Sequence, residues 1–408
     1  MTSIISSLTT RQISSLSTAT IAGLSTTDID ALSTAQVAAL TAPQVNALNT
    51  ADLQEFAATQ VAALSSTVMH ALLTAQIQSF STTQITELTT GQVAVLTSTQ
   101  IGALTTAELQ GLTTAQTNAL TAAQLASLTT GTLNNLSTDQ FAGLTTVQAN
   151  ALTSTQLNGL TTDNLNALDI TQLTTTQVGG LNATAIGNLT TSQVTALTTG
   201  EVAKLSSAQL NALTTAEVQA LTTAQANALT TAQIASLSTG TLNNLTTDQV
   251  AGLTSVQVHG LTSTQLNGLS TDNLNALDVT LLTTTQVGGL NATAIGNLST
   301  DQVGALTAGD IATLSVADLN ALTTTEIGGF TAGQAGALTS TQIAGMSTAN
   351  FSALSETTGI PGLSVAAIAG ITTAEINALT STQGNAFIQA QVEVMSIDQI
   401  TALVTLVG

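Results

Sequence analysis

An eight-residue repeat runs through almost the whole chain, and most copies end on leucine. It is visible at TTRQISSL (9–16), STATIAGL (17–24) and STAQVAAL (33–40). The eighth position is Leu in 41 of the 48 octads, and its substitutes are Phe, Met and Ile. A position that admits only large apolar side chains is expected to be buried. The repeat therefore predicts one small unit per octad, stabilised by stacking on its neighbours.

The octad phase divides the chain into three parts. Octads fill residues 1–354, apart from two five-residue steps, DITQL (169–173) and DVTLL (278–282). An irregular segment containing Pro361 occupies 355–363, and residues 364–408 hold the terminal octads and a C-terminal segment. A longer duplication relates 130–190 to 239–299 and copies the pentad with its surroundings. We interpret the pentads as tolerated phase steps inside one array.

The start of each octad carries a helix-capping signature. The consensus is [ST]-T-x-[QED]-[VIL]-x-[AG]-L, and Ser or Thr followed three residues later by Gln or Glu is typical of a capping box. Of the 22 carboxylates, fifteen lie at the third or fourth octad position, where the helix dipole favours negative charge. The predicted cap pairs include Thr9 with Gln12, Thr105 with Glu108, Thr214 with Glu217, and Thr372 with Glu375.

The large apolar residues occupy the fifth and eighth octad positions. A spacing of three residues places them on one helical face. The seventh position is usually Ala or Gly, which permits close approach of a neighbouring backbone. The expected core residues include Ile13, Leu16, Leu40, Leu104, Leu213 and Leu379.

This pattern predicts an all-α solenoid, a superhelical rod with one short capped helix per octad. A single continuous helix is disfavoured, because a period of 4.0 residues per turn would make the apolar stripe spiral off one face. A β-solenoid is the alternative, since Thr and Val favour strands. However, inward residues of a strand are two apart, and the 3-then-5 spacing breaks that alternation.

The sequence offers little for catalysis or metal binding. His70 and His259 are the only histidines, both lie at the variable sixth position, and neither has a local carboxylate cluster. No phosphate loop or calcium loop is present. Asp169 and Asp278 open the two pentads, where a turn residue is favoured over a metal ligand. We predict no enzyme activity, no catalytic, cofactor or metal site, and no bound small molecule.

Charge and hydropathy limit the partners. The net charge is −20, with Arg11 and Lys204 as the only basic residues, so nucleic acid is excluded as a partner. No apolar run approaches the roughly 20 residues of a membrane span. The N-terminus, MTSIISSLTTRQ, lacks the basic and apolar regions of a cleaved signal peptide.

The LTTAQVAAL-like register resembles the low-complexity octad repeats of large bacterial exoproteins of adhesin or filament type. The resemblance covers nearly the whole chain and implies an extracellular fibre, stalk or filament. We therefore expect a secreted or cell-surface structural protein that is an adhesin stalk or a self-assembling filament subunit, hence a homo-oligomer or polymer.

Two other functions remain as alternatives. One is an intracellular protein-binding scaffold, and the more remote one is an ice-binding array of threonines. The C-terminal stretch from Phe387 to Gly408 is more apolar than the body of the array. It is interpreted either as a docking or export segment or as a divergent cap.

Overall fold

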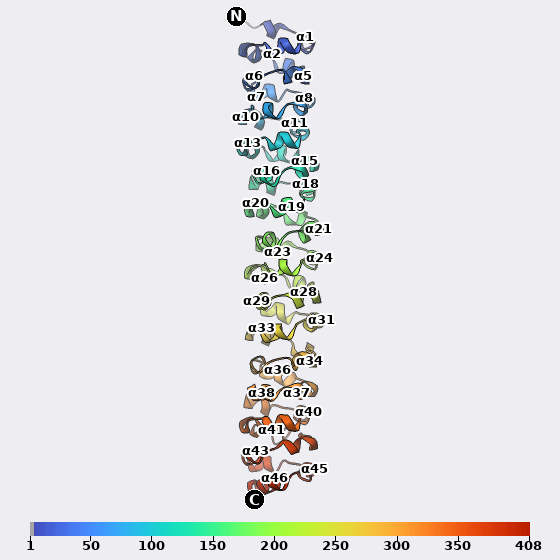
Figure 1. Cartoon of the computed structure of the whole chain (residues 1–408), viewed down its shortest axis with the longest axis vertical. Coiled ribbons are helices and arrows are strands. Elements are labelled where there is room, and N and C mark those ends of the chain that lie inside the picture. Colours follow the sequence, from blue (N-terminus) through green and yellow to red (C-terminus); the bar gives the residue numbers. More distant parts are fainter. Residues whose placement is uncertain (1–3) are drawn as a thin grey trace. The chain divides into compact units, whose positions relative to one another are not determined.

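The computed structural model describes residues 4–408, which form short helices joined by tight turns, with no β-strand among them (Figure 1). Contacts divide the chain into two units that meet in sequence between Leu197 and Thr198. The first unit runs from η1 (Ile4–Ser7) and α1 (Thr10–Ser15) to α23 (Thr191–Ala196), and the second from α24 (Thr199–Val202) to α46 (Ile397–Val407). The prediction of an all-α solenoid is confirmed, and the β-solenoid alternative is wrong.

Each octad folds as one short helix followed by an extended residue. In α11 (Thr90–Val95), the preceding Thr89 is extended and caps the helix. The eighth residue, Leu96, returns to φ −60° and ψ 139°, while its N–H still donates to the carbonyl of Val93. The chain therefore turns without any positive φ among the described residues. This explains why the repeat ends on leucine and needs no glycine at its turn.

The octads wind into a coil within each unit. Helix α10 (Thr82–Thr86) packs against α7 (Ala58–Val61) and α13 (Thr106–Gly111), the helices three positions away on either side. Side-chain hydrogen bonds reach one octad further. Gln92 bonds to the carbonyls of Val61 and Leu64, 31 and 28 residues earlier. One turn of the coil therefore contains between three and four octads, a quantity that the repeat alone does not give.

The core of each coil is a column of fifth- and eighth-position side chains. Ile101 and Leu104 are 1% and 5% exposed, and Phe141 is 1% exposed. Each such side chain contributes about 1.5–3 kcal/mol relative to exposure. A helix of four to six residues has no stability of its own, because helix nucleation is unfavourable. The octads are therefore held by stacking on adjacent turns.

The two pentads are shortened octads that keep a place in the coil. They form η2 (Ile170–Gln172) and η3 (Val279–Leu281), and each buries two apolar side chains. After the first pentad, Gln177 bonds to the carbonyls of Ala149 and Leu152, 28 and 25 residues earlier. Both separations are three residues smaller than the usual 31 and 28, which is the difference between an octad and a pentad. A pentad therefore shifts the phase of the sequence repeat but leaves the hydrogen-bonding register between turns of the coil unchanged.

The irregular segment 355–363 also fills one octad position. It contains turns in place of a helix, yet Ile360 and Leu363 are buried like fifth and eighth residues. Gln391 donates to both of their carbonyls, at 2.9 and 2.8 Å. The Thr358 hydroxyl donates to the carbonyl of Phe330, 28 residues earlier. The segment therefore departs from the helix pattern without interrupting the coil.

The last helix differs from the others in length and in packing. Helix α46 has 11 residues and packs against α43 (Thr373–Asn377) and α44 (Ser381–Gly384). The Ser381 hydroxyl donates to the carbonyl of Leu406 at 3.0 Å. This packing joins the C-terminal helix to the preceding turn, while Ile397 and Val404 on the same helix stay exposed.

Candidate functional site

The fourth residue of the octad ties consecutive turns together. In α18 (Thr146–Ala151), Gln148 Oε1 accepts hydrogen bonds from the Thr145 N–H and hydroxyl at 3.0 and 3.1 Å. Its Nε2 donates to the carbonyls of Thr117 and Leu120 on the preceding turn, both at 2.9 Å. A primary amide offers two donors and two acceptor sites, so this buried side chain is fully satisfied. We name this set of bonds the glutamine staple.

The cap residues expected from the sequence lie at helix starts, in α1, α13, α26 (Thr215–Ala220) and α43. In every pair the threonine hydroxyl accepts from the N–H of the fourth residue. The threonine N–H in turn donates to the side-chain oxygen of the fourth residue in every pair. The N···O distances are 2.8 Å for Thr9–Gln12, 2.7 Å for Thr105–Glu108, 2.7 Å for Thr214–Glu217 and 2.6 Å for Thr372–Glu375.

One expected core residue is not buried. Leu16 is only partly buried, in contrast to the other core residues expected from the sequence. It belongs to the first described turn of the coil, as Leu8 and Leu24 do, so a neighbouring turn covers it on one side only. The others are at most 6% exposed, namely Ile13, Leu40, Leu104, Leu213 and Leu379.

Carboxylates replace the staple glutamine in nine octads. A carboxylate can accept the N-cap N–H but has no N–H to donate to the previous turn. Eight of the nine are buried, and Glu375 is the most buried at 1% exposure. Its Oε2 accepts from the Thr372 N–H and hydroxyl, while its buried Oε1 has no hydrogen-bond partner. Burial raises the pKa of the Glu375 carboxyl above its ordinary 4.5, although the bonds from Thr372 act to lower it.

Sixth-position asparagines form a second set of bonds between turns. Asn243 donates from Nδ2 to the carbonyl of Gly268 at 2.9 Å, and its Oδ1 accepts from the Ser270 N–H at 2.8 Å. The octad of Ser270 has Asn273 at its fourth position, and that side chain bonds to the previous turn instead. We name the two bonds of Asn243 the asparagine brace. The same brace links Asn134 to Thr161, Asn158 to Asn182, Asn211 to Ser238, Asn267 to Asn291, and Asn320 to Ser347.

The braces occur where a staple cannot close the cap. In every octad whose first N–H is held by a brace, the fourth residue is Asn, Ala or Thr, not Gln, Glu or Asp. Ala has no acceptor in its side chain, and the three Asn side chains, Asn164, Asn273 and Asn350, donate to carbonyls of the preceding turn instead. In these octads, the N–H of the first residue is therefore bonded by an asparagine from the unit four positions earlier. In octads with a staple, the same N–H is bonded by the fourth residue of its own octad.

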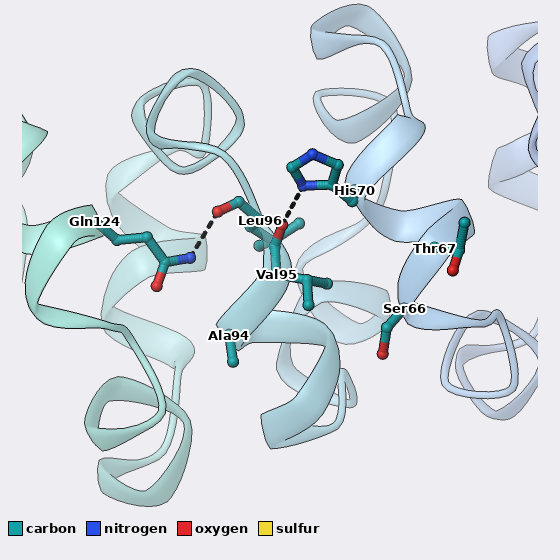
Figure 2. Close-up of a pocket in the computed structure, with 7 residues that line it drawn as sticks. All are labelled: Ser66, Thr67, His70, Ala94, Val95, Leu96 and Gln124. Carbon is teal, nitrogen blue, oxygen red and sulfur yellow. Dashed lines mark hydrogen bonds between the residues drawn. The ribbon is translucent and has the colours of Figure 1, made fainter.

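A surface hollow of the first unit lies beside His70. It has a volume of about 550 Å³ and is lined by residues of α8 (Ser66–Ala71), α11 and Gln124 of α15 (Ala122–Ser127). His70 Nδ1 lies 2.7 Å from the carbonyl of Val95, which can only accept, so the ring donates. Figure 2 shows Ser66 and Thr67 pointing away from the ring. Because no carboxylate lines the hollow, it contains no nucleophile–base–acid arrangement.

The other candidates for chemistry have structural roles. His259 ends α31 (Ser255–His259) at an exposed position. Asp169 Oδ1 accepts from the Thr171 N–H and hydroxyl at 3.0 and 2.7 Å, and Asp278 caps its pentad in the same way. Within residues 4–408, no three His, Cys, Asp or Glu side chains gather as metal ligands would. No helix in that range combines the length and apolarity that a membrane crossing requires.

Comparison with known families identifies the repeat. Five segments match the family model described as the ALTTAQ repeat, at residues 5–42, 69–106, 202–239, 231–263 and 311–348. Each match spans several consecutive octads, and two of the matches lie in the first unit and three in the second. No curated protein matches the chain. The chain is thus a repeat protein, folded as short capped helices and similar to the ALTTAQ repeat over these segments, which together cover less than half of its length.

Proposed function

We propose that this chain is a non-enzymatic structural protein outside the cell or on its surface, acting as a stalk or as the subunit of a self-assembling filament. One observation carries the proposal: the polar groups that recur in every turn are bonded within the coil itself. The cap hydroxyls are bonded within their own octads, and the staple amides and the asparagine braces hold one turn to the next. The hollow at His70 has no acidic side chain in its lining to pair with the imidazole.

The tolerance of the coil for unequal units supports a spacer role. A pentad and a nine-residue segment each take the place of one octad, and the register of the staples continues beyond them. In such a quasi-one-dimensional array each unit contacts only near neighbours, so the number of units sets the length. Such a length dependence suits a stalk or a filament subunit, whose function depends on its length and does not require a binding or catalytic site.

Composition supports the location. The chain has no cysteine, so its stability does not depend on a redox compartment. It has two basic residues in 408, so it offers trypsin-like proteases very few cleavage sites. Its octads resemble those of bacterial exoproteins, as argued from the sequence. All three properties suit a protein exposed to an extracellular environment.

A register-preserving deletion tests the spacer role. Removing residues 130–238 joins Thr129 to Thr239 and restores the octad TTGTLNNL, because the deletion equals the duplication offset. About a quarter of the chain is lost. We expect the shortened protein to stay helical by circular dichroism and to form particles shorter by about a quarter in negative-stain micrographs. A matched deletion of residues 134–238 leaves one twelve-residue unit at the junction, longer than any unit of the array, and should lose helicity and inter-turn protection near that junction. Particles of unchanged length would contradict the spacer role.

Sedimentation and microscopy of the intact protein separate the structural roles. Filaments that lengthen with protein concentration would support the subunit role, and single particles of fixed length at all concentrations would support the stalk. Retention of the protein inside the producing cell, with a partner protein co-purifying in stoichiometric amount, would instead support the scaffold alternative.

A further inference from the structure

The carboxyl of Glu375 occupies a position that the coil builds for a hydrogen-bond donor. In the octads that follow, Gln391 donates to the carbonyls of Ile360 and Leu363, and Gln399 donates to those of Ile368 and Ile371, at 2.7 to 2.9 Å. These glutamines bond to the unit that lies four units earlier in the chain. For the octad of Glu375, the unit four units earlier is the octad that begins at Thr339. By this register the Glu375 side chain faces the carbonyls of Ile343 and Met346.

An ionised carboxylate is the wrong partner for two carbonyl oxygens. Its oxygens only accept, so the ionised form would place three acceptors together in a site closed to water. In agreement with this register argument, Glu375 Oε1 is buried and has no hydrogen-bond partner. The other oxygen is held in place by the Thr372 N–H at 2.6 Å and hydroxyl at 2.8 Å. The side chain cannot turn its free oxygen to solvent without breaking the helix cap.

A proton on Oε1 removes the mismatch. A carboxylic acid O–H is a donor with a normal reach of 2.5–3.0 Å to an acceptor, similar to the distances that the staple amides span. We propose that Glu375 is a proton-operated staple, which bonds to the preceding turn when protonated and loses that bond when ionised. The turns it joins, 339–346 and 372–379, would then hold together more tightly in acid than at neutral pH.

No neighbouring charge supplies an alternative explanation. Helix α43 packs against α42 (Thr348–Ser352) and α46, and the staple register adds α41 (Ser340–Gly345). Helices α41 and α42 contain no titratable side chain, and α46 contains only Asp398, which is exposed in its first turn. The chain terminus at Gly408 follows α46. The effect therefore depends on burial and on missing donors, not on an ion pair.

The direction of the pH effect follows from linkage. Burial raises the pKa of Glu375 above 4.5, so the folded chain keeps this proton at pH values where the unfolded chain has lost it. The contribution to stability is complete below about pH 4.5 and is lost as pH rises through the folded pKa. This sign is opposite to that of a carboxylate held in an ion pair, which loses stability in acid.

Native-state hydrogen exchange of the full chain tests the proposal, with exchange rates corrected for the intrinsic pH dependence. Between neutral pH and pH 4 we expect protection of amides in 339–346 and 372–379 to rise about three- to tenfold, the worth of one net hydrogen bond. Glu375→Gln supplies permanent donors, so it should raise neutral-pH protection and abolish this pH dependence. Equal protection at both pH values in the wild type, or an unchanged profile in Glu375→Gln, would overturn the proposal.

Two further variants separate this role from general acid effects. Gln391→Glu places a carboxyl at a staple position that is 0% exposed, and it should create a second pH-dependent turn at 355–363. Glu393→Gln changes an exposed carboxylate two octads away and should leave the profile as in the wild type. Infrared spectroscopy gives a direct readout. A protonated carboxyl band should persist above the titration of exposed carboxylates in the wild type and be absent from Glu375→Gln, and its absence from the wild type would overturn the proposal.

Discussion

Replacing Gln257 with methionine should remove one complete staple while leaving no large cavity, because the two side chains are similar in volume. Gln257 is 2% exposed. Its Oε1 accepts from the Thr254 N–H and hydroxyl, both at 3.0 Å, and its Nε2 donates to the carbonyls of Ala226 and Leu229, both at 2.9 Å. The substitution therefore deletes two bonds within the octad and two bonds between turns.

The cost depends on which groups are left without a partner. The Ala226 carbonyl still accepts from the Leu229 N–H at 3.2 Å. The Thr254 N–H and the Leu229 carbonyl lose the staple bond, and each buried unsatisfied group costs about 1–3 kcal/mol. We therefore expect Gln257→Met to lower the free energy of unfolding by about 2–6 kcal/mol, which is a large share of the stability of a typical domain.

Urea denaturation followed by circular dichroism measures this loss, and hydrogen exchange locates it. Amides near 226–229 and 254–258 should lose protection before the rest of the second unit. The matched control is Gln219→Met, which changes an exposed sixth-position glutamine nearby and should cost less than about 0.5 kcal/mol. If the two variants are equally stable, the inter-turn bonds contribute nothing and the staple argument is refuted.

Burial and local order give two further expectations. Leu157→Ala empties a fully buried core position and should cost about 2–5 kcal/mol in thermal or urea unfolding, whereas Leu16→Ala, at a half-covered position, should cost less than half as much. Native trypsin digestion should cut at Arg11, in the first described turn, well before Lys204, whose backbone N–H is bonded to the carbonyl of Glu201 at 2.9 Å. Cleavage at Lys204 first, read by mass spectrometry, would contradict a uniformly closed coil.

The features that the sequence predicts are those formed within one octad. The Thr105–Glu108 cap and the burial of Leu104 depend on residues three apart, so the repeat consensus is enough to infer them. The partners of the staple amide are 28 and 31 residues away, and they depend on how many octads complete one turn. Octad spacing alone does not determine the number of octads per turn, because that number follows from the angle between successive helices.

A signal for the staple was nevertheless present in the composition of the fourth position. Glutamine occupies it in 28 octads and glutamate in five, although both residues close a capping box equally well. A strong preference for the amide over the acid indicates that its N–H groups also have partners. The preference does not say where those partners lie, which is why the prediction of caps stopped at one octad.

The asparagine braces leave a correlation between residue types at two distant positions of the sequence. In Asn211 with Thr241, and in Asn320 with Asn350, a sixth-position asparagine precedes a short fourth residue by 30 residues. The Asn158 and Ala185 pair has an offset of 27, because a pentad lies between its members. The offset thus follows the number of units in a turn and not the number of residues.

A double-mutant cycle on Asn243 and Asn273 tests whether staple and brace are alternative partners for one backbone N–H. Asn243→Ala leaves the Ser270 N–H and the Gly268 carbonyl without their side-chain partner, which should cost about 1–3 kcal/mol. Asn273→Gln restores a staple residue whose Oε1 can accept from the Ser270 N–H. In that background Asn243→Ala should cost about 0.5–1.5 kcal/mol less, because only the Gly268 carbonyl then loses a partner. Strictly additive free energies would mean that the two devices act independently and that their correlation along the chain has another cause.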